Sequence, residues 1–103
     1  MTPERIAALA VSTLFSITAQ AETIQVTIDK LVFAPADLNA KVGDTIEWVN
    51  KDVLAHTATA TNGDWNVVTG PTQSGRVVLK KAGAVDYFCK YHPNMKGRVI
   101  VTP

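Results

Sequence analysis

The chain has 103 residues, of which 47% are hydrophobic, and its charged side chains nearly cancel to a formal net charge of +1. This length predicts a single domain. A chain so small and nearly neutral has no general electrostatic basis for binding nucleic acid or a membrane surface. Because it contains one cysteine, no disulfide can form within it.

The first 21 residues have the pattern of a secretory signal peptide. Arg5 precedes an apolar run over 6–17, and Ala19-Gln20-Ala21 matches an A-x-A cleavage site. The run is about a dozen residues long, well short of the ~20 that a helix needs to cross a bilayer. It also lacks the amphipathic pattern of a core helix. We therefore predict a signal peptide over 1–21, export to the periplasm, and a mature domain over 22–103.

The mature sequence is a succession of short strands. Ile24, Val26 and Ile28 alternate with polar residues, as in a half-buried strand, and Phe33 and Pro35 mark a short element at a sheet edge. Further strands are predicted over 38–42, 45–49, 55–61, 76–79, 85–89 and 99–102.

The connections complete the fold prediction. Asn62-Gly63 is a strong β-hairpin signal, whereas 64–73, with Gly70 and Pro71, is expected to be an irregular connection. No mature segment has a helical period. We therefore predict an all-β fold, a β-sandwich or small barrel of about seven short strands.

Four side chains stand out as candidate metal ligands. Cys89, His92 and Met95 are spaced three apart in a loop between two predicted strands, and His56, on a different strand, is the only other histidine. Pro93 restricts His92 to extended backbone conformations and so stiffens the loop. Three side chains on such a loop can converge on one point, with His56 reaching it from a neighbouring strand.

The donor set favours copper. A thiolate, two imidazoles and a thioether suit copper in an electron-transfer site, whereas structural zinc prefers four cysteines and histidines. Each residue alone has an ordinary explanation as a buried thiol, a core or surface histidine, or a core methionine. Their coincidence in an exported chain whose cysteine has no partner favours one metal site.

The segment from Cys89 to Gly97, C-K-Y-H-P-N-M-K-G, resembles the C-terminal ligand loop of the blue-copper cupredoxins. Its C-x₂-H-x₂-M spacing is similar to the short loop of amicyanins rather than the longer loop of plastocyanin or pseudoazurin. The resemblance continues upstream through Val42–Asn50, with its G-D-T-x-x-W-x-N pattern, to His56, and covers nearly all of the mature chain.

The resemblance implies a Greek-key β-sandwich that holds one type 1 copper ion, cycling between +1 and +2. By this resemblance His56, Cys89 and His92 are ligands and Met95 is the axial ligand.

Two departures from the family pattern matter. Thr57 stands where many members have an Asn that braces the cysteine loop, and we expect Thr57 and Asn50 to support the ligands. The connection from His56 to Cys89 is also shorter than in the better-known members, which leaves open the loss of a strand or loop.

The leading functional hypothesis is a monomeric periplasmic one-electron carrier between redox proteins such as a c-type cytochrome and a periplasmic dehydrogenase. The electron would pass through His92. Pro35, Leu54, Pro93 and Asn94 are candidates for the docking surface.

Three questions remain open from the sequence. The same ligands would suit a protein that stores or delivers copper. A Cys–His hydrolase is disfavoured, because no helix start is evident near Cys89 to activate the thiol. Finally, 22–70 carries three basic and seven acidic residues, and 71–103 six basic and one acidic. This asymmetry indicates either solvated strand faces or a basic rim that steers an acidic partner.

Overall fold

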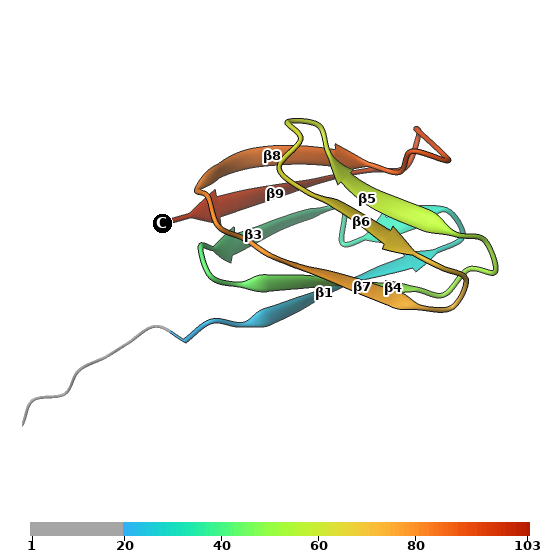
Figure 1. The fold of residues 1–103 in the computed structure, drawn as a ribbon, viewed down its shortest axis with the longest axis horizontal. Coiled ribbons are helices and arrows are strands. Elements are labelled where there is room, and N and C mark those ends of the chain that lie inside the picture. Colours follow the sequence, from blue (N-terminus) through green and yellow to red (C-terminus); the bar gives the residue numbers. More distant parts are fainter. Residues whose placement is uncertain (1–19) are drawn as a thin grey trace, which may run out of the picture.

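The computed structural model describes residues 20–103, which form two β-sheets packed face to face (Figure 1). The strands of this part of the chain are β1 (Thr23–Asp29), β2 (Val32–Ala34), β3 (Asp37–Lys41), β4 (Thr45–Asn50), β5 (His56–Ala60), β6 (Asn66–Thr69), β7 (Ser74–Val78), β8 (Gly83–Phe88) and β9 (Lys96–Thr102). Residues 1–19 of the predicted signal peptide lie outside the described residues.

The chain crosses repeatedly between the two sheets. One sheet has the order β2-β1-β4-β7 and the other β3-β9-β8-β5-β6. The pairs β1–β4 and β3–β9 are parallel, while the remaining neighbours are antiparallel. The predicted all-β Greek-key sandwich is confirmed. Within residues 20–103 no helix is long and apolar enough to span a membrane.

Two details of the strand prediction are wrong. The described residues contain nine strands rather than about seven, and the predicted irregular connection over 64–73 includes strand β6. Its Val67 and Thr69 are buried while Asn66 and Val68 are exposed, but four residues flanked by Gly70 and Pro71 are a weak periodic signal. The Asn62-Gly63 hairpin is confirmed, since it joins β5 to β6.

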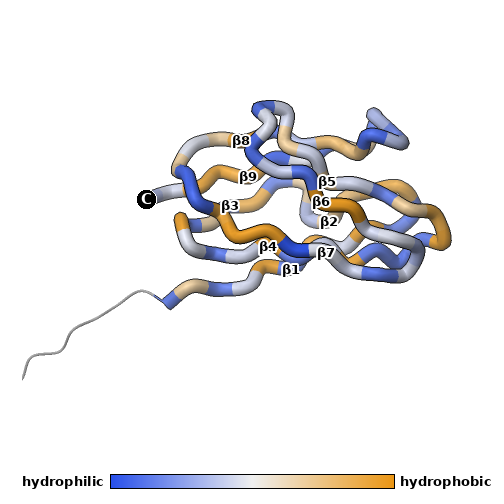
Figure 2. The backbone as a smooth tube through the Cα atoms, viewed as in Figure 1, coloured by the Kyte–Doolittle hydropathy of each residue, from blue (hydrophilic) through white to orange (hydrophobic). Residues whose placement is uncertain are grey.

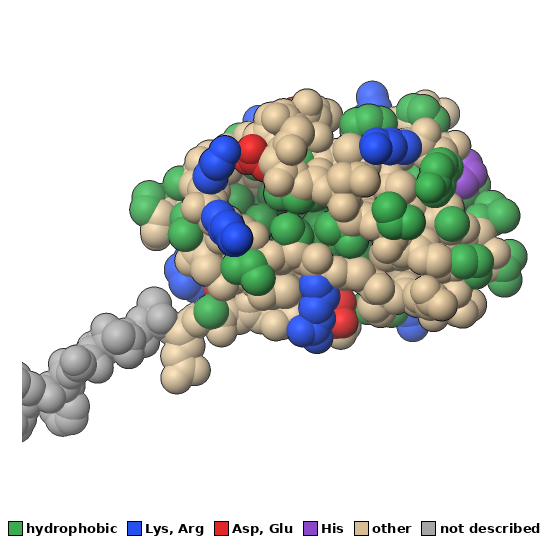
Figure 3. Space-filling view, viewed as in Figure 1, with side chains coloured by type: hydrophobic (Ala, Val, Ile, Leu, Met, Phe, Trp, Pro, Cys, Tyr) green, Lys and Arg blue, Asp and Glu red, His purple; other side chains and the backbone are tan. Residues whose placement is uncertain are grey.

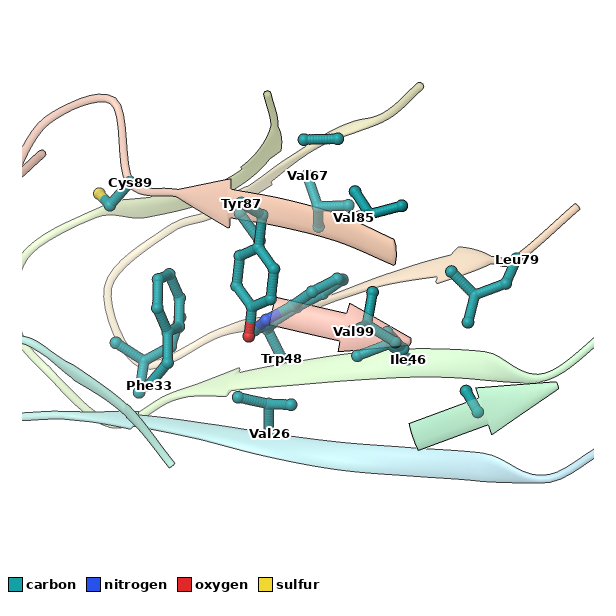
Figure 4. Close-up of a cluster of buried hydrophobic side chains, with 14 of the residues drawn as sticks. Val26, Phe33, Ile46, Trp48, Val67, Leu79, Val85, Tyr87, Cys89 and Val99 are labelled. Atoms are coloured by element: carbon teal, nitrogen blue, oxygen red, sulfur yellow. The ribbon is translucent and has the colours of Figure 1, made fainter. Parts of the chain in front are cut away.

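The core lies between the sheets and is built by alternation. Val26 and Ile28 of β1 and Ile46 and Trp48 of β4 have no exposed surface, as period-2 patterning predicts. The same alternation appears along the chain as hydrophobic positions interleaved with polar ones (Figure 2). Figure 4 shows the buried side chains of both sheets converging between the ribbons.

Aromatic rings fix the end of β8 that precedes the ligand loop. The Tyr87 ring lies 4.8 Å from that of Phe33, 5.4 Å from that of Trp48 and 5.5 Å from that of Trp65, measured between centroids. A Cβ at Gly97 of β9 would overlap the Tyr87 ring, so glycine permits this close approach. Cys89 follows two residues later on the same buried face (Figure 4).

A buried carboxylate joins the start of β1 to the turn before β4. Asp44 accepts hydrogen bonds from the backbone N–H of Glu22 (2.9 Å) and of Lys41 (2.8 Å). The N–H of Glu22, followed by that of Lys41, lowers the pKa of Asp44 from its usual value of 3.8. Because the folded pKa is the lower one, the ionised group stabilises the fold above about pH 4. This contribution is lost as the pH falls through the lowered pKa.

We predict that Asp44→Asn weakens the acid dependence of stability. Urea unfolding of the copper-free protein between pH 7 and pH 2 should show a smaller loss of unfolding free energy in this variant than in the wild type. Asp29→Asn, at an exposed carboxylate, is the matched control and should follow the wild type. Equal acid losses in wild type and Asp44→Asn would contradict the assignment.

Candidate metal centre

Three potential ligand atoms meet at one end of the sandwich. Sγ of Cys89 lies 3.7 Å from Nδ1 of His56 and 3.8 Å from Nδ1 of His92, and the three ligand atoms all lie within 4.8 Å of one another. The two imidazole rings are 5.0 Å apart. His56 and Cys89 are fully buried, and His92 is half-buried. The structure thus brings together three of the four side chains that the sequence suggested as ligands.

The ligand loop owes its spacing to consecutive tight turns. The N–H of His92 donates to the carbonyl of Cys89, and the N–H of Met95 donates to the carbonyl of His92. The N–H of Cys89 in turn donates to the carbonyl of Met95 and closes the loop. Because each turn joins residue i to residue i+3, a ligand at every third residue stands at the end of a turn.

Met95 and the four docking candidates differ in their burial. Met95 is 3% exposed, at the closing end of the loop that holds the other two ligands. Its hydrogen bonds fix its backbone next to Cys89. The four docking candidates, Pro35, Leu54, Pro93 and Asn94, are all exposed.

Thr57 braces the cysteine. Its N–H donates to Sγ of Cys89 (3.3 Å), and its hydroxyl oxygen accepts the N–H of Lys90 (2.8 Å). A hydrogen bond to sulfur stabilises the thiolate form that binds metal. Thr57 therefore supports both the ligand atom and the first residue of the loop, the role expected of an Asn in many cupredoxins.

Asn50 organises the loop that leads to His56. Its side-chain NH₂ donates to the carbonyls of Leu54 (2.8 Å) and Gly70 (3.0 Å), and its side-chain oxygen accepts the N–H of Asp52 (2.8 Å). Asn50 is 1% exposed, so these bonds satisfy an amide that would be costly to bury unpaired. It supports the ligands through the loop backbone, since none of its hydrogen bonds reaches a ligand side chain.

Asp52 contacts a candidate ligand, although no sequence pattern indicated it. Its Oδ2 lies 2.8 Å from Nε2 of His56, the nitrogen that faces away from Cys89. Burial acts to raise the pKa of Asp52, but the N–H groups of Leu31 and Lys30 and the ring of His56 outweigh it, and the pKa lies below its usual 3.8. Metal-bound histidines commonly donate their second ring N–H to a carboxylate, and this contact has that form.

The sulfur–nitrogen separations would suit a metal ion held by Cys89 and the two imidazoles. Metal–sulfur and metal–nitrogen bonds of about 2.3 and 2.0 Å, separated by a trigonal angle of about 120°, put sulfur and nitrogen about 3.7 Å apart. The observed separations of 3.7 and 3.8 Å match this value. A trigonal His₂Cys set with a weak axial methionine is typical of copper electron-transfer sites.

Comparisons with known proteins agree with this geometry. The profile of the cupredoxin-like domain family matches residues 5–101. An amicyanin from Paracoccus versutus is 32% identical over 79% of this chain, which spans 66% of that protein's length, just under two thirds. Methylamine utilization protein MauL from Methylorubrum extorquens is 38% identical over 79% of the chain and 75% of its own length. A crystal structure of Paracoccus versutus amicyanin superposes with a TM-score of 0.67 at 32% identity, covering 82% of this chain and 84% of that one.

The chain therefore belongs to the cupredoxin-like family, and it is similar to amicyanins in both sequence and structure. The family and the His56–Cys89–His92 cluster together indicate one copper ion as the cofactor, cycling between Cu(I) and Cu(II).

We predict that Thr57→Val lowers the unfolding free energy by about 1 kcal/mol, because the N–H of Lys90 loses its acceptor. Urea unfolding measures this loss, and hydrogen exchange of the Lys90 amide should become faster. Thr57→Ser keeps the hydroxyl and serves as the control. A Val variant with unchanged exchange at Lys90 would contradict the bracing role.

Proposed function

We propose that the protein is a blue copper protein that carries single electrons between redox partners in the periplasm. The observation that supports this proposal most directly is the cluster of one buried thiol and two imidazoles at trigonal separations. In this proposal His56, Cys89 and His92 would hold the metal, and Met95 would supply a weak thioether ligand. Copper, when bound, would accept one electron as Cu(II) and release it as Cu(I).

The polypeptide contributes rigidity. Thr57 fixes Cys89, and the carbonyl and N–H groups of the ligand loop bond to one another. The backbone bonds of the loop join groups that would not bind the metal, so they would hold the ligands in one arrangement for both oxidation states. Little nuclear rearrangement is then needed during transfer, which suits a carrier better than a protein that must release copper.

Burial indicates where the electron would enter and leave. His56 and Cys89 have no exposed surface, whereas His92 is half-buried and Pro93 and Asn94 beside it are exposed. Figure 3 shows a histidine at the surface at one end of the molecule, among hydrophobic side chains. We assign His92 as the exit and entry point, since it is the candidate ligand closest to solvent.

The docking surface would be the apolar end of the sandwich around this histidine. Val53 and Leu54, in the loop before His56, are 80% and 50% exposed, and Figure 2 shows hydrophobic segments at the same end. An apolar patch of this kind marks an interaction site. Together with Pro35, Pro93 and Asn94 it offers a surface for a c-type cytochrome or a periplasmic dehydrogenase. One relative is named methylamine utilization protein MauL, which favours a partner in methylamine utilization.

Export after cleavage at Ala21 is also part of the proposal. Cleavage would free the α-amino group of Glu22, whose nitrogen lies 2.9 Å from Oδ1 of Asp44. The new N-terminus would then be held by a carboxylate that is 2% exposed. In a mature domain over 22–103, the carboxylate of Asp44 would therefore bind the new α-amino group.

Copper binding is the first test of this function. We expect Cu(II) added to purified 22–103 to give an intense visible band from thiolate-to-copper charge transfer, and a reversible one-electron wave in voltammetry. Cys89→Ser should abolish the band, and Met95→Leu should keep the band but change the potential. Colourless Cu(II) binding that persists in Cys89→Ser would exclude the proposed site. Copper that is lost on each reduction would instead favour delivery of the metal.

A charged substitution in the proposed docking surface tests this assignment. We expect Leu54→Lys to slow electron transfer to a c-type cytochrome on the order of tenfold, a loss of about 1.4 kcal/mol in the encounter, with the visible spectrum unchanged. Val78→Lys is the matched control, because Val78 is similarly exposed but pairs with Thr45, at the opposite end of β4. Stopped-flow kinetics at two ionic strengths measure both. Equal rates in the two variants would refute the assignment.

A further inference from the structure

The two ring nitrogens of His56 face different partners. Nδ1 points to Sγ of Cys89 at 3.7 Å, and Nε2 points to Oδ2 of Asp52 at 2.8 Å. A nitrogen that binds a metal cannot carry a proton, so a metal-bound His56 must carry its proton on Nε2 and donate it to Asp52. Since His56 is fully buried and Asp52 is only 14% exposed on its side chain, little water competes for this bond.

The same carboxylate holds the turn between β1 and β2. Oδ1 of Asp52 accepts the N–H of Lys30 (2.7 Å), and Oδ2 also accepts the N–H of Leu31 (3.0 Å). These two residues have φ values of 53° and 63°, a conformation that hairpins usually give to Asn-Gly. Neither Lys nor Leu favours it. The carboxylate therefore binds a turn whose own residues do not specify its shape.

Three N–H donors from two separate segments thus converge on one carboxylate. The bonds to Lys30 and Leu31 fix the carboxylate relative to β1, and the bond to His56 fixes the imidazole relative to the carboxylate. Asn50, whose side-chain oxygen accepts the N–H of Asp52, fixes the backbone of Asp52 as well. The orientation of the His56 imidazole is therefore set through Asp52, on the side away from Cys89. The groups that fix Asp52, the N–H groups of Lys30 and Leu31 and the side chain of Asn50, do not themselves bond to the ligand side chains.

We propose that Asp52 is the positioning residue of the centre: it orients His56, holds the proton on Nε2, and ties this ligand to the β1–β2 turn. The inference rests on the proposed copper function. The negative charge of Asp52 beside the imidazole makes His56 a stronger electron donor to the metal. A stronger donor favours Cu(II) over Cu(I), so Asp52 lowers the reduction potential.

Asp52→Asn is the direct test in the copper-loaded protein. The amide would turn an NH₂ donor or a single oxygen toward three N–H groups, so the set can no longer be satisfied. We expect Cu(II) affinity to fall 10- to 100-fold, the range for lost partners of metal-bound histidines, and Cu(I) affinity to fall less. A tenfold difference between the two losses corresponds to a rise of about 59 mV in the potential.

Two further variants separate positioning from folding. The double variant Lys30→Asn/Leu31→Gly keeps both backbone N–H groups and suits the turn, so its potential should equal that of the wild type. Asp52→Glu keeps the charge on a longer arm and should recover most of the Cu(II) affinity. If Asp52→Asn does not fold, Asp52→Ser replaces it, since Ser also removes the charge.

NMR of the copper-free protein supplies a readout that does not depend on the metal. The His56 Nε2–H should exchange slowly with solvent in the wild type and quickly in Asp52→Asn, with shifts at the Lys30 and Leu31 amides. An unchanged potential and unchanged Nε2–H exchange in a folded Asp52→Asn would overturn the positioning role. A wild type that binds no copper, yet shows the protected Nε2–H, would overturn the proposed function while leaving the contact in place.

Discussion

The centre depends on the hydrogen bonds of Thr57, which join β5 to the ligand loop beyond the point where the pairing of β5 with β8 ends. The paired residues of these strands are Thr59 with Phe88 and Ala60 with Tyr87, so the ladder stops before it reaches the ligands. Beyond that point the N–H of Thr57 donates to Sγ of Cys89, and its hydroxyl accepts the N–H of Lys90. Side-chain bonds thus keep the two strand ends together while leaving room between them for a metal and its imidazoles.

The ligand side chains are placed by two sets of contacts, which Thr57 joins. The loop of Cys89, His92 and Met95 is a local structure, closed by its own backbone bonds. His56 is held by long-range contacts, through Asp52 to the β1–β2 turn and through its carbonyl to the hydroxyl of Thr69. Local and long-range contacts thus act together, which explains how a domain of this size maintains a defined donor geometry.

This division also explains what could be predicted from the sequence. The ligand loop was predictable because a three-residue spacing matches i to i+3 turns, which put a ligand at the end of each turn. The sandwich was predictable because alternation decides which faces are buried, as in Ile46 and Trp48. Asp52 was not, because its position depends on how an irregular loop meets a turn some twenty residues earlier, and neither segment has a periodic pattern. Strand β6 was not predicted for a related reason, because Gly70 and Pro71 directly after this short strand indicate a loop.

Ion pairs on the surface cancel part of the charge asymmetry between the two halves of the sequence. Of the six basic residues after 70, Arg76 pairs with Glu47, Lys81 with Asp64 and Arg98 with Asp86. Exposed pairs of this kind add little to stability, but they cancel charge locally. The other three, Lys80, Lys90 and Lys96, form no ion pair with another described residue; of these, Lys90 lies within the ligand loop and Lys96 directly follows it. In the proposed docking, a partner would meet about two lysines at the ligand loop rather than six basic residues, so apolar contact would contribute more than long-range steering.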